Sequence, residues 1–361
     1  MTEVLGQHVQ GRPSSDGEKG RSPLSSPSPE GGSGQAGPPG DQSPLSGGQA
    51  ARPTGRLGDA IFGRSAQGAG VVVIALVTLV GVFLLSQAVP SLAKNEANFF
   101  TSREWTVGGD RPRFGIFELL WTTVTASVLA MAIAVPVGIC VALFITEYAP
   151  RWLQRPAASL VDLLAAVPSI VFGFWGLSVA GQYFQPVQDF LAGTFGFIPF
   201  FKDSGFSAKS TLAFAGIILA FMILPIITAI SREVFNQVPT PHKEGALALG
   251  ATKWEMIRTA VLPFGKPGVI SGAMLGLGRA LGETLAVMIL LSTLNPSAPW
   301  SFSIFNGGET FASKIALNAG EFDSPQKTGA YIAAGLVLFI LTFIVNSIAR
   351  VVINRRKAFS E

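Results

Sequence analysis

The sequence predicts an all-α integral membrane protein with six transmembrane helices and with both termini in the cytoplasm. Hydrophobic residues make up 48% of the 361 residues and charged residues only 13%, and the mean hydropathy is +0.45. This composition is too apolar and too weakly charged for an ordinary soluble domain of this length. The second observation is a set of long apolar runs, because about 20 helical residues are needed to cross a bilayer core of about 30 Å.

Each apolar run is long enough to be one span. The spans are expected at about residues 69–88, 119–146, 158–182, 211–231, 268–293 and 331–350. Pro136, Pro168 and Pro225 lie inside the second, third and fourth runs and predict kinks there. The single cysteine, Cys140, lies in the second run, so no disulfide can form within the chain.

The distribution of lysine and arginine predicts the orientation. With the N-terminus in the cytoplasm, the inner loops and tails hold more of these cations than the outer loops, although the outer loops are longer in total. This positive-inside bias favours a topology with both termini inside, and Arg111 and Arg113 are exceptions to it. Asp162 is expected near the cytoplasmic interface, as a helix cap or as the partner of a basic loop residue.

Residues 1–67 differ in composition from residues 68–361, which are expected to form the transmembrane domain. The first segment is rich in Gly, Pro and Ser and has few large apolar side chains, so it cannot bury enough surface to offset chain entropy. It is expected to be a disordered cytoplasmic tail. The alternative, that the first apolar run is a signal peptide cleaved near Ala93, is disfavoured because the run is too long and starts too late.

The segment 240–263, between the fourth and fifth spans, has the sequence signals of two short helices. Thr240 is a good N-cap, and Pro241 suits the first helical position, where its missing N–H would be unsatisfied anyway. A first helix is therefore expected from Pro241 to Leu249. Gly250 then supplies a residue that tolerates the left-handed conformation that ends many helices.

A second helix is expected directly after this turn. Thr252 and Glu255 have the spacing of a capping box, in which each side chain accepts a hydrogen bond from the backbone N–H of the other residue. The helix carries Trp254 on its apolar face and is expected to stop before Pro263. The two helices form either an ordinary loop between spans or a compact element that docks on a partner.

The motifs exclude three kinds of intrinsic chemistry. The stretch from Gly245 to Gly250 resembles a phosphate-binding loop, but the Lys and Ser/Thr that must follow the second glycine directly are absent. The glycines from Gly276 to Gly282 lie in an apolar run with no strand before it, which excludes a dinucleotide fold. With two histidines and one cysteine, no zinc or haem ligand set can be assembled, so no cofactor, metal site or catalytic residue is expected.

Arg279 and Glu283 stand out because they lie inside the fifth apolar run, where a charge costs about 2.5–3.5 kcal/mol on insertion scales. Spaced four apart, they are expected to share a helix face with Gly268, Gly272 and Gly276, and this face is expected to meet a helix or a cavity and not lipid. Two interpretations stay open. The charges form an ion pair that holds two helices together, or the guanidinium lies on a polar path and binds an anion while Glu283 orients it and moderates its affinity.

Hydroxyl side chains in the second run are a weaker signal. Thr122, Thr123, Thr125 and Ser127 could line a path. Hydroxyls in helices commonly bond back to carbonyl groups of their own helix, and this structural interpretation is favoured.

Three stretches resemble a known family. The pattern E-x-A-x-x-x-G from Glu244 to Gly250, followed by Leu262 and Pro263, resembles the EAA loop of ABC importer permeases. Within that superfamily the chain closely resembles the PstC family of phosphate permeases, over residues 161–173, 244–255 and 275–284. The likeness extends from about residue 68 to the C-terminus.

The resemblance implies roles for particular residues. Arg279 and Glu283 match a motif associated with phosphate transport and are expected on the substrate path. The EAA loop docks on ATPase subunits, which implies this role for Glu244, Gly245, Ala246, Gly250, Trp254, Leu262 and Pro263. Gly245 and Ala260 depart from the family pattern and are expected to loosen the docking helices, since glycine costs about 1 kcal/mol relative to alanine in a helix interior.

The resemblance also implies a function, that of a permease subunit of an ABC importer that moves inorganic phosphate across the plasma membrane with ATP hydrolysed by other subunits. The implied partners are a second, PstA-like permease, a dimeric PstB-like ATPase, a PstS-like extracytoplasmic phosphate-binding protein, inorganic phosphate and the lipid bilayer, but no nucleic acid. A permease for sulfate or molybdate is the nearest alternative. A membrane enzyme acting on a lipid-linked phosphate would lack a reason to keep an ATPase-docking loop, and a sensor or scaffold subunit would support no uptake.

Overall fold

The computed structural model describes residues 56–294 and 300–357, most of which are helical. The chain divides into two units, Met1–Gly63 and Arg64–Glu361. Of the first unit, only the residues that begin α1 are described. The second unit holds every other element named below.

The helices in the described ranges vary widely in length. The α-helices are α1 (Arg56–Lys94), α2 (Phe117–Leu143), α3 (Arg151–Ala166), α4 (Ser169–Ser178), α5 (Gln185–Phe195), α6 (Leu212–Asn236), α7 (Thr240–Ala248), α8 (Lys253–Met256), α9 (Leu262–Leu281), α10 (Leu285–Leu290), α11 (Phe311–Leu317) and α12 (Pro325–Lys357). π-Helical turns lie at Phe144–Tyr148 and Ile257–Val261, and 3-10 turns at Ala180–Tyr183, Pro199–Phe201, Ala208–Ser210 and Ala319–Glu321. An antiparallel hairpin, β1 (Trp105–Thr106) and β2 (Arg113–Phe114), pairs Trp105 with Phe114 and Thr106 with Arg113.

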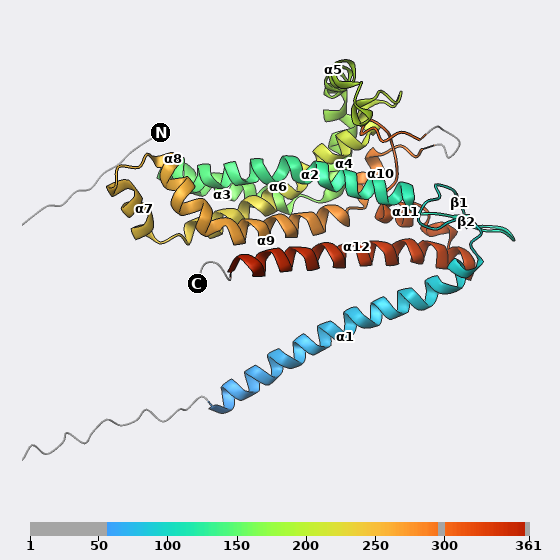
Figure 1. The fold of residues 1–361 in the computed structure, drawn as a ribbon, viewed down its shortest axis with the longest axis horizontal. Coiled ribbons are helices and arrows are strands. Elements are labelled where there is room, and N and C mark those ends of the chain that lie inside the picture. The colour runs from blue at the N-terminus through green and yellow to red at the C-terminus, as the bar shows by residue number, and fades with distance from the viewer. Residues whose placement is uncertain (1–55, 295–299, 358–361) are drawn as a thin grey trace, which may run out of the picture. The chain divides into compact units, whose positions relative to one another are not determined.

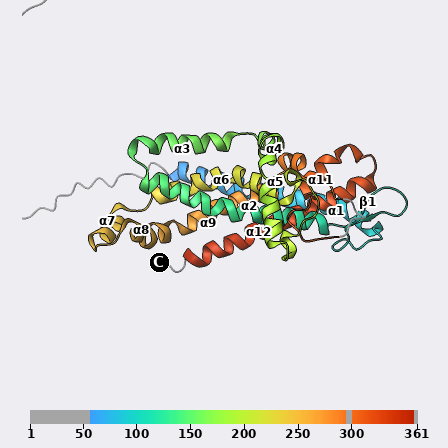
Figure 2. The same cartoon turned by 90° about the horizontal axis from the view of Figure 1, so that it is seen from above.

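Helices α2, α6 and α9 form the centre of the second unit (Figure 1). On α2, Ala126, Ala130 and Ala134 follow one another at intervals of four residues and are almost fully buried. Small residues at this spacing let two helix backbones approach closely. Figure 2 shows α3 along one side of this group and α12 along the other, and contacts join α3 to α6 and α12 to α9.

The third predicted span is a bent pair of helices and not one straight helix. Helices α3 and α4 meet at an angle of 90°. Val167, between them, is extended, because the residue before a proline is driven out of the helical region. Pro136 and Pro225, in contrast, lie inside the continuous helices α2 and α6. The carboxylate of Asp162 pairs with Arg232 at 3.3 Å, as a basic partner was expected, but Arg232 lies within α6 and not in a loop.

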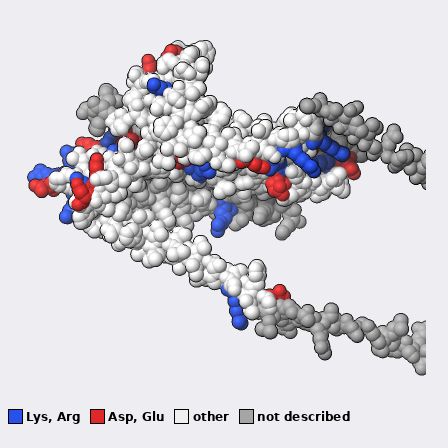
Figure 3. Space-filling model, turned by 180° about the vertical axis from the view of Figure 1, so that it is seen from behind, with Lys and Arg blue, Asp and Glu red and all other residues white. Residues whose placement is uncertain are grey.

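Five described helices are long and apolar enough to cross a membrane, and six if the α3–α4 pair counts as one crossing. The chain is therefore a helical integral membrane protein, while the number of crossings and the position of the termini stay predictions. The surface of α1 has no charge between Arg64 and Lys94 (Figure 3). Most of the predicted tail lies outside the described residues, but α1 begins at Arg56, ahead of the predicted boundary at residue 68. Gly58 and Gly63, which belong to the predicted tail, lie within this helix, and a Cβ added at either position would meet no atom of the described residues within 4 Å.

A loop with little regular structure is buried at the end of the bundle where β1, β2 and α11 lie (Figure 1). Residues 303–311 are all buried. Two of their carbonyl groups accept hydrogen bonds from amides at the start of α6: Leu212 N donates to Asn306 O at 2.8 Å, and Ala213 N donates to Ile304 O at 2.7 Å. These bonds satisfy amides that have no partner within a helix. The loop thereby closes one end of the bundle.

The buried loop also explains why the favoured interpretation of the α2 hydroxyls is wrong for three of them. Thr123 Oγ1 accepts a hydrogen bond from Phe311 N at 3.2 Å. Thr122 Oγ1 and Ser127 Oγ have no hydrogen-bond partner among the described residues. Thr122 packs closely against the backbone of Gly308. Among the described residues, none of these three hydroxyls bonds back to a carbonyl group of α2, and Thr122 and Thr123 contact the loop instead.

Candidate functional site

Helix α7 opens the 240–263 segment. It begins at Thr240, one residue earlier than expected, with the extended residue Pro239 in the capping position and no side-chain cap. The prediction of Thr240 as the N-cap is therefore wrong. The first turn still accepts Pro241, because the N–H that proline lacks would have no partner within the helix there.

The turn after α7 is a Schellman motif, a common way of ending a helix. Gly250 has φ +85°, in the left-handed region where glycine is favoured, as predicted from its position. Gly250 N donates to Leu247 O at 3.0 Å and Ala251 N donates to Ala246 O at 3.2 Å, which is the bond pair of this motif. Ala246 thus fixes the turn through its backbone.

The predicted capping box starts α8. Glu255 N donates to Thr252 Oγ1 at 3.3 Å, and Thr252 N donates to Glu255 Oε2 at 2.8 Å. Both orphan amides of the capping box are satisfied, so the direction of α8 after the glycine turn is fixed.

The prediction that the second helix stops before Pro263 is wrong. The helical path runs from Lys253 to Leu281 without a break. A π-helical turn at Ile257–Val261 comes just before the proline, and Leu262 N donates to Ile257 O, five residues back. The wider turn relieves the crowding that a proline ring causes with the preceding turn. Helix α8 is consequently continuous with α9.

Two contacts fasten the segment to the π-helical turn Phe144–Tyr148, which follows α2. Lys243 Nζ of α7 lies 2.6 Å from Glu147 Oε1, whose side chain is only 7% exposed. Lys253 Nζ lies 4.7 Å from the centre of the Tyr148 ring, within the range of a cation–π contact. Beneath these contacts Ile257, buried completely, belongs to an apolar cluster that includes residues of α2 and α6. The sequence reasoning missed Glu147 and Tyr148, although an acidic residue at the end of an apolar run was a visible signal.

The outer face of the segment is apolar at its tip. Leu249 is 91% exposed, and Trp254 and Leu247 are also exposed. Glu244 is exposed and Gly245 has no neighbour within contact distance of the position where a Cβ would lie. Several large exposed apolar side chains on one short segment, unlike a single exposed leucine, are typical of a surface that binds a partner.

Arg279 lies near the end of α9 and is exposed on the isolated chain. It lines an open groove of ≈ 550 Å³ with residues of three helices, among them Ile226 of α6, Leu275 of α9 and Asn346 of α12. Among the described residues the guanidinium has no ion-pair partner. Within an apolar helix, an exposed arginine requires a polar partner or water beside it.

Glu283 does not share a helix face with Arg279, and the predicted pair is wrong in this respect. The fifth predicted span is interrupted, because α9 ends at Leu281 and α10 begins at Leu285. Glu283 lies between them, is 8% exposed, and its Oε1 accepts a hydrogen bond from Ala286 N at 3.1 Å. A carboxylate at the start of α10 satisfies a free amide and the positive end of the helix dipole.

The glycine stripe packs closely against α6, as predicted. A Cβ on Gly272 would lie 3.1 Å from Ile230, and a Cβ on Gly276 would lie 3.1 Å from Ile227. Gly268 fits against Val234 with no room for a side chain. These small residues therefore let α9 pack closely against α6, and two grooves lie beside other faces of α9.

No group of three or more His, Cys, Asp or Glu side chains in the described ranges is placed to hold a metal ion. The described site thus consists of a helical turn, an arginine in a groove and a carboxylate that caps a helix.

Comparison with known proteins places these features in a family. Residues 134–358, which include the 240–263 segment and Arg279, match the model of the binding-protein-dependent transport system inner membrane component. The phosphate transport system permease protein PstC 2 of Mycobacterium tuberculosis is 49% identical over 300 residues, which cover 82% of this chain and 92% of that protein. The phosphate transport system permease protein PstC of Mycobacterium leprae is 52% identical over 278 residues, 76% of this chain and 86% of the relative. PstC of Mesorhizobium japonicum is 37% identical over 302 residues, 83% and 91% of the two chains. The chain therefore belongs to the family of binding-protein-dependent transport system inner membrane components, together with the PstC permeases.

Proposed function

We propose that this chain is the permease subunit of an ABC importer that moves inorganic phosphate into the cell with ATP hydrolysed by separate subunits. The observation that carries the proposal is the 240–263 segment. It presents the exposed side chains of Leu249 and Trp254 on a turn that a Schellman motif and a capping box hold in place. The sequence has no phosphate-binding loop of its own, so the energy for transport must come from a partner.

The residues proposed for ATPase docking are Glu244, Gly245, Ala246, Gly250, Trp254, Leu262 and Pro263. Their position supports this role, because they lie in one segment whose second helix continues into α9. A displacement of Trp254 by a moving ATPase would therefore reach Arg279 along one helical path. The segment then lies in the cytoplasm, which agrees with the charge bias and with termini on the inner side.

Arg279 is the proposed phosphate contact. Its planar guanidinium suits tetrahedral oxyanions, which it binds through two parallel hydrogen bonds. It lies in an open groove without an ion-pair partner among the described residues, so an anion has access to it. Glu283 acts differently from the sequence prediction, because its carboxylate holds the start of α10 and so fixes the end of the path.

The proposed partners are a second, PstA-like permease, a dimeric PstB-like ATPase and a PstS-like extracytoplasmic phosphate-binding protein. The relatives are named phosphate transport system permeases, which supports phosphate as the substrate. The exposed apolar surfaces of α1 and of the tip at Leu249 support contacts with lipid or protein in the assembled transporter.

The test is uptake into proteoliposomes by the complex reconstituted with the candidate partners. Labelled phosphate uptake should require ATP and should be inhibited by unlabelled phosphate far more than by sulfate or molybdate. Arg279→Gln should abolish uptake while ATPase subunits still bind, and Arg350→Gln, on α12, is the matched control. Uptake by Arg279→Gln with unchanged phosphate dependence would refute the substrate contact, and preference for sulfate or molybdate would refute the substrate.

A further inference from the structure

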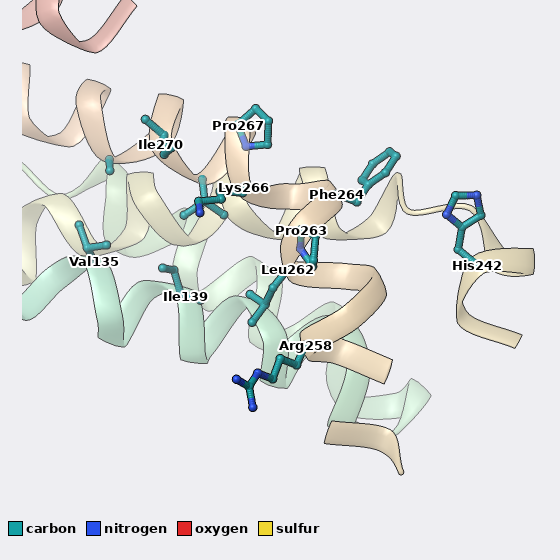
Figure 4. A pocket seen from close by; sticks show the side chains of 12 residues that line it. Val135, Ile139, His242, Arg258, Leu262, Pro263, Phe264, Lys266, Pro267 and Ile270 are labelled. Atoms are coloured by element: carbon teal, nitrogen blue, oxygen red, sulfur yellow. The ribbon is translucent and has the colours of Figure 1, made fainter. Parts of the chain in front are cut away.

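A second and larger groove lies between α2, α7 and α9. Its volume is ≈ 1290 Å³. Figure 4 shows Lys266 extending from α9 into it, with Arg258 at its edge and Val135 and Ile139 of α2 opposite. It shares no lining residue with the groove that holds Arg279.

The two grooves lie on different sides of α9. At 100° per residue, Lys266 and Arg279 point about 140° apart around the helix axis. Gly272 and Gly276, which pack on α6, lie between the two directions. The larger groove is therefore not part of the proposed phosphate path.

The lining of the larger groove changes in character along its length. Arg258 and Lys266 are exposed cations at the end near α7, and neither has an ion-pair partner among the described residues. Beyond them, Ile270 and Ala273 of α9 face Val135 and Ile139 of α2. From Lys266 to Ala273 the helix rises on the order of 10 Å, a large part of the roughly 15 Å depth of one hydrocarbon leaflet.

We propose that this groove binds an anionic phospholipid of the inner leaflet. The phosphodiester lies between Arg258 and Lys266, and an acyl chain lies along the apolar part between α2 and α9. Basic pockets between membrane helices at the cytoplasmic side suit such headgroups. The placement in the inner leaflet rests on the proposed function, which puts the 240–263 segment in the cytoplasm.

The lining favours a lipid over the other occupants. Free inorganic phosphate would satisfy the two cations but would leave the apolar part unfilled, and that part gains its stabilisation only from apolar atoms. A helix of a second permease would fill the apolar part but would bury two unpaired cations, which is costly unless it supplied acidic partners. A phospholipid satisfies both parts with one molecule.

The experiment is native mass spectrometry of the complete transporter purified from vesicles of equal parts phosphatidylglycerol and phosphatidylcholine. The wild-type complex should retain phosphatidylglycerol in preference to phosphatidylcholine. Lys266→Gln and Arg258→Gln should each lower the retained phosphatidylglycerol roughly tenfold, while Arg151→Gln, an exposed arginine at the start of α3, should leave it unchanged. Ala273→Phe fills the apolar part without changing charge and should lower retention of both lipids.

Three results would overturn the proposal. One is a wild-type complex without preference for phosphatidylglycerol, which needs no variant and therefore does not depend on folding. Another is full retention of phosphatidylglycerol in Ala273→Phe, which would mean that the acyl chain does not lie in the apolar part of this groove. The third is displacement of the retained lipid by millimolar inorganic phosphate, which would assign the cations to free phosphate. The Arg279→Gln complex should keep its phosphatidylglycerol, so loss of uptake and loss of lipid are separate outcomes.

Discussion

The ion pair between Lys243 and Glu147 should decide whether movement of α7 reaches the membrane domain. The Nζ and Oε1 atoms are 2.6 Å apart, and the side chains are 22% and 7% exposed. At an effective dielectric constant of about 20, the direct attraction is roughly 6 kcal/mol. Desolvation of the two charges offsets much of it, so the net value of the pair is far smaller than its gross attraction.

The exposed fractions of the two side chains predict which single substitution lowers the stability more. Lys243→Gln leaves a nearly buried carboxylate without its partner, and removal of one partner from a buried pair costs about 3–5 kcal/mol. We expect the lower end, about 3 kcal/mol, because the pair is not fully closed to water. Glu147→Gln leaves a lysine that can still reach water, and we expect about 1–2 kcal/mol.

The assay is a double-mutant cycle on unfolding by dodecyl sulfate in mixed micelles, with uptake by the reconstituted complex measured in parallel. The double variant should be less destabilised than the sum of the single variants by about 1–2 kcal/mol. The ATP hydrolysed per phosphate transported should rise in both single variants. Lys202→Gln, an exposed lysine, is the control and should change stability by less than about 0.5 kcal/mol. If the destabilisations of the two single variants add up to that of the double variant within about 0.3–0.5 kcal/mol, the two side chains are not coupled and the reasoning is refuted.

Three further variants test the local structure. Gly245→Ala should stabilise α7 by about 0.5–1 kcal/mol, because an added Cβ there meets no neighbour among the described residues and alanine favours the helix. The free energy of unfolding in mixed micelles measures this effect, and a lower stability would contradict the prediction. Thr252→Ala should cost about 1 kcal/mol through loss of the capping box and should speed hydrogen exchange in α8, whereas unchanged exchange would show that the cap is dispensable. Gly329→Leu should displace α1 from α12, because a side chain at that position would collide with Ser91. Hydrogen exchange near Ser91 should become faster while exchange at the α2–α6 contact stays the same, and unchanged exchange near Ser91 would contradict the prediction.

Features set by neighbouring residues could be predicted from the sequence. The positive φ of Gly250 and the capping box at Thr252 depend on a few consecutive residues, and the apolar runs depend on composition alone. The close packing of the glycine stripe followed from helical periodicity. These signals located the rigid turn and the apolar helices, but not the bounds of the helices, since the predicted run 69–88 lies well inside α1 and the predicted run 268–293 is interrupted after Leu281.

Features set by distant contacts could not be predicted. Glu147 and Lys243 are 96 residues apart in sequence, and only the fold brings their charges together. The end of α9 at Leu281 was missed because the apolar run continues beyond it, and nothing in its periodicity shows that Glu283 will cap a new helix. The proximity of Arg279 and Glu283 in sequence therefore suggested a pair that the helix boundary separates.

Pro263 does not interrupt the helical path between α8 and α9. The sequence predicted that the second short helix would stop before this proline. The π-helical turn at Ile257–Val261 instead joins α8 to α9, since the helical hydrogen bonds continue through it. The proposed movement of α8 would then be transmitted to α9 directly, because the helical path between them is continuous. The position where movement must be absorbed shifts to the opposite end of α9, at Gly282, where the helix stops beside Arg279 and the Glu283 cap begins α10.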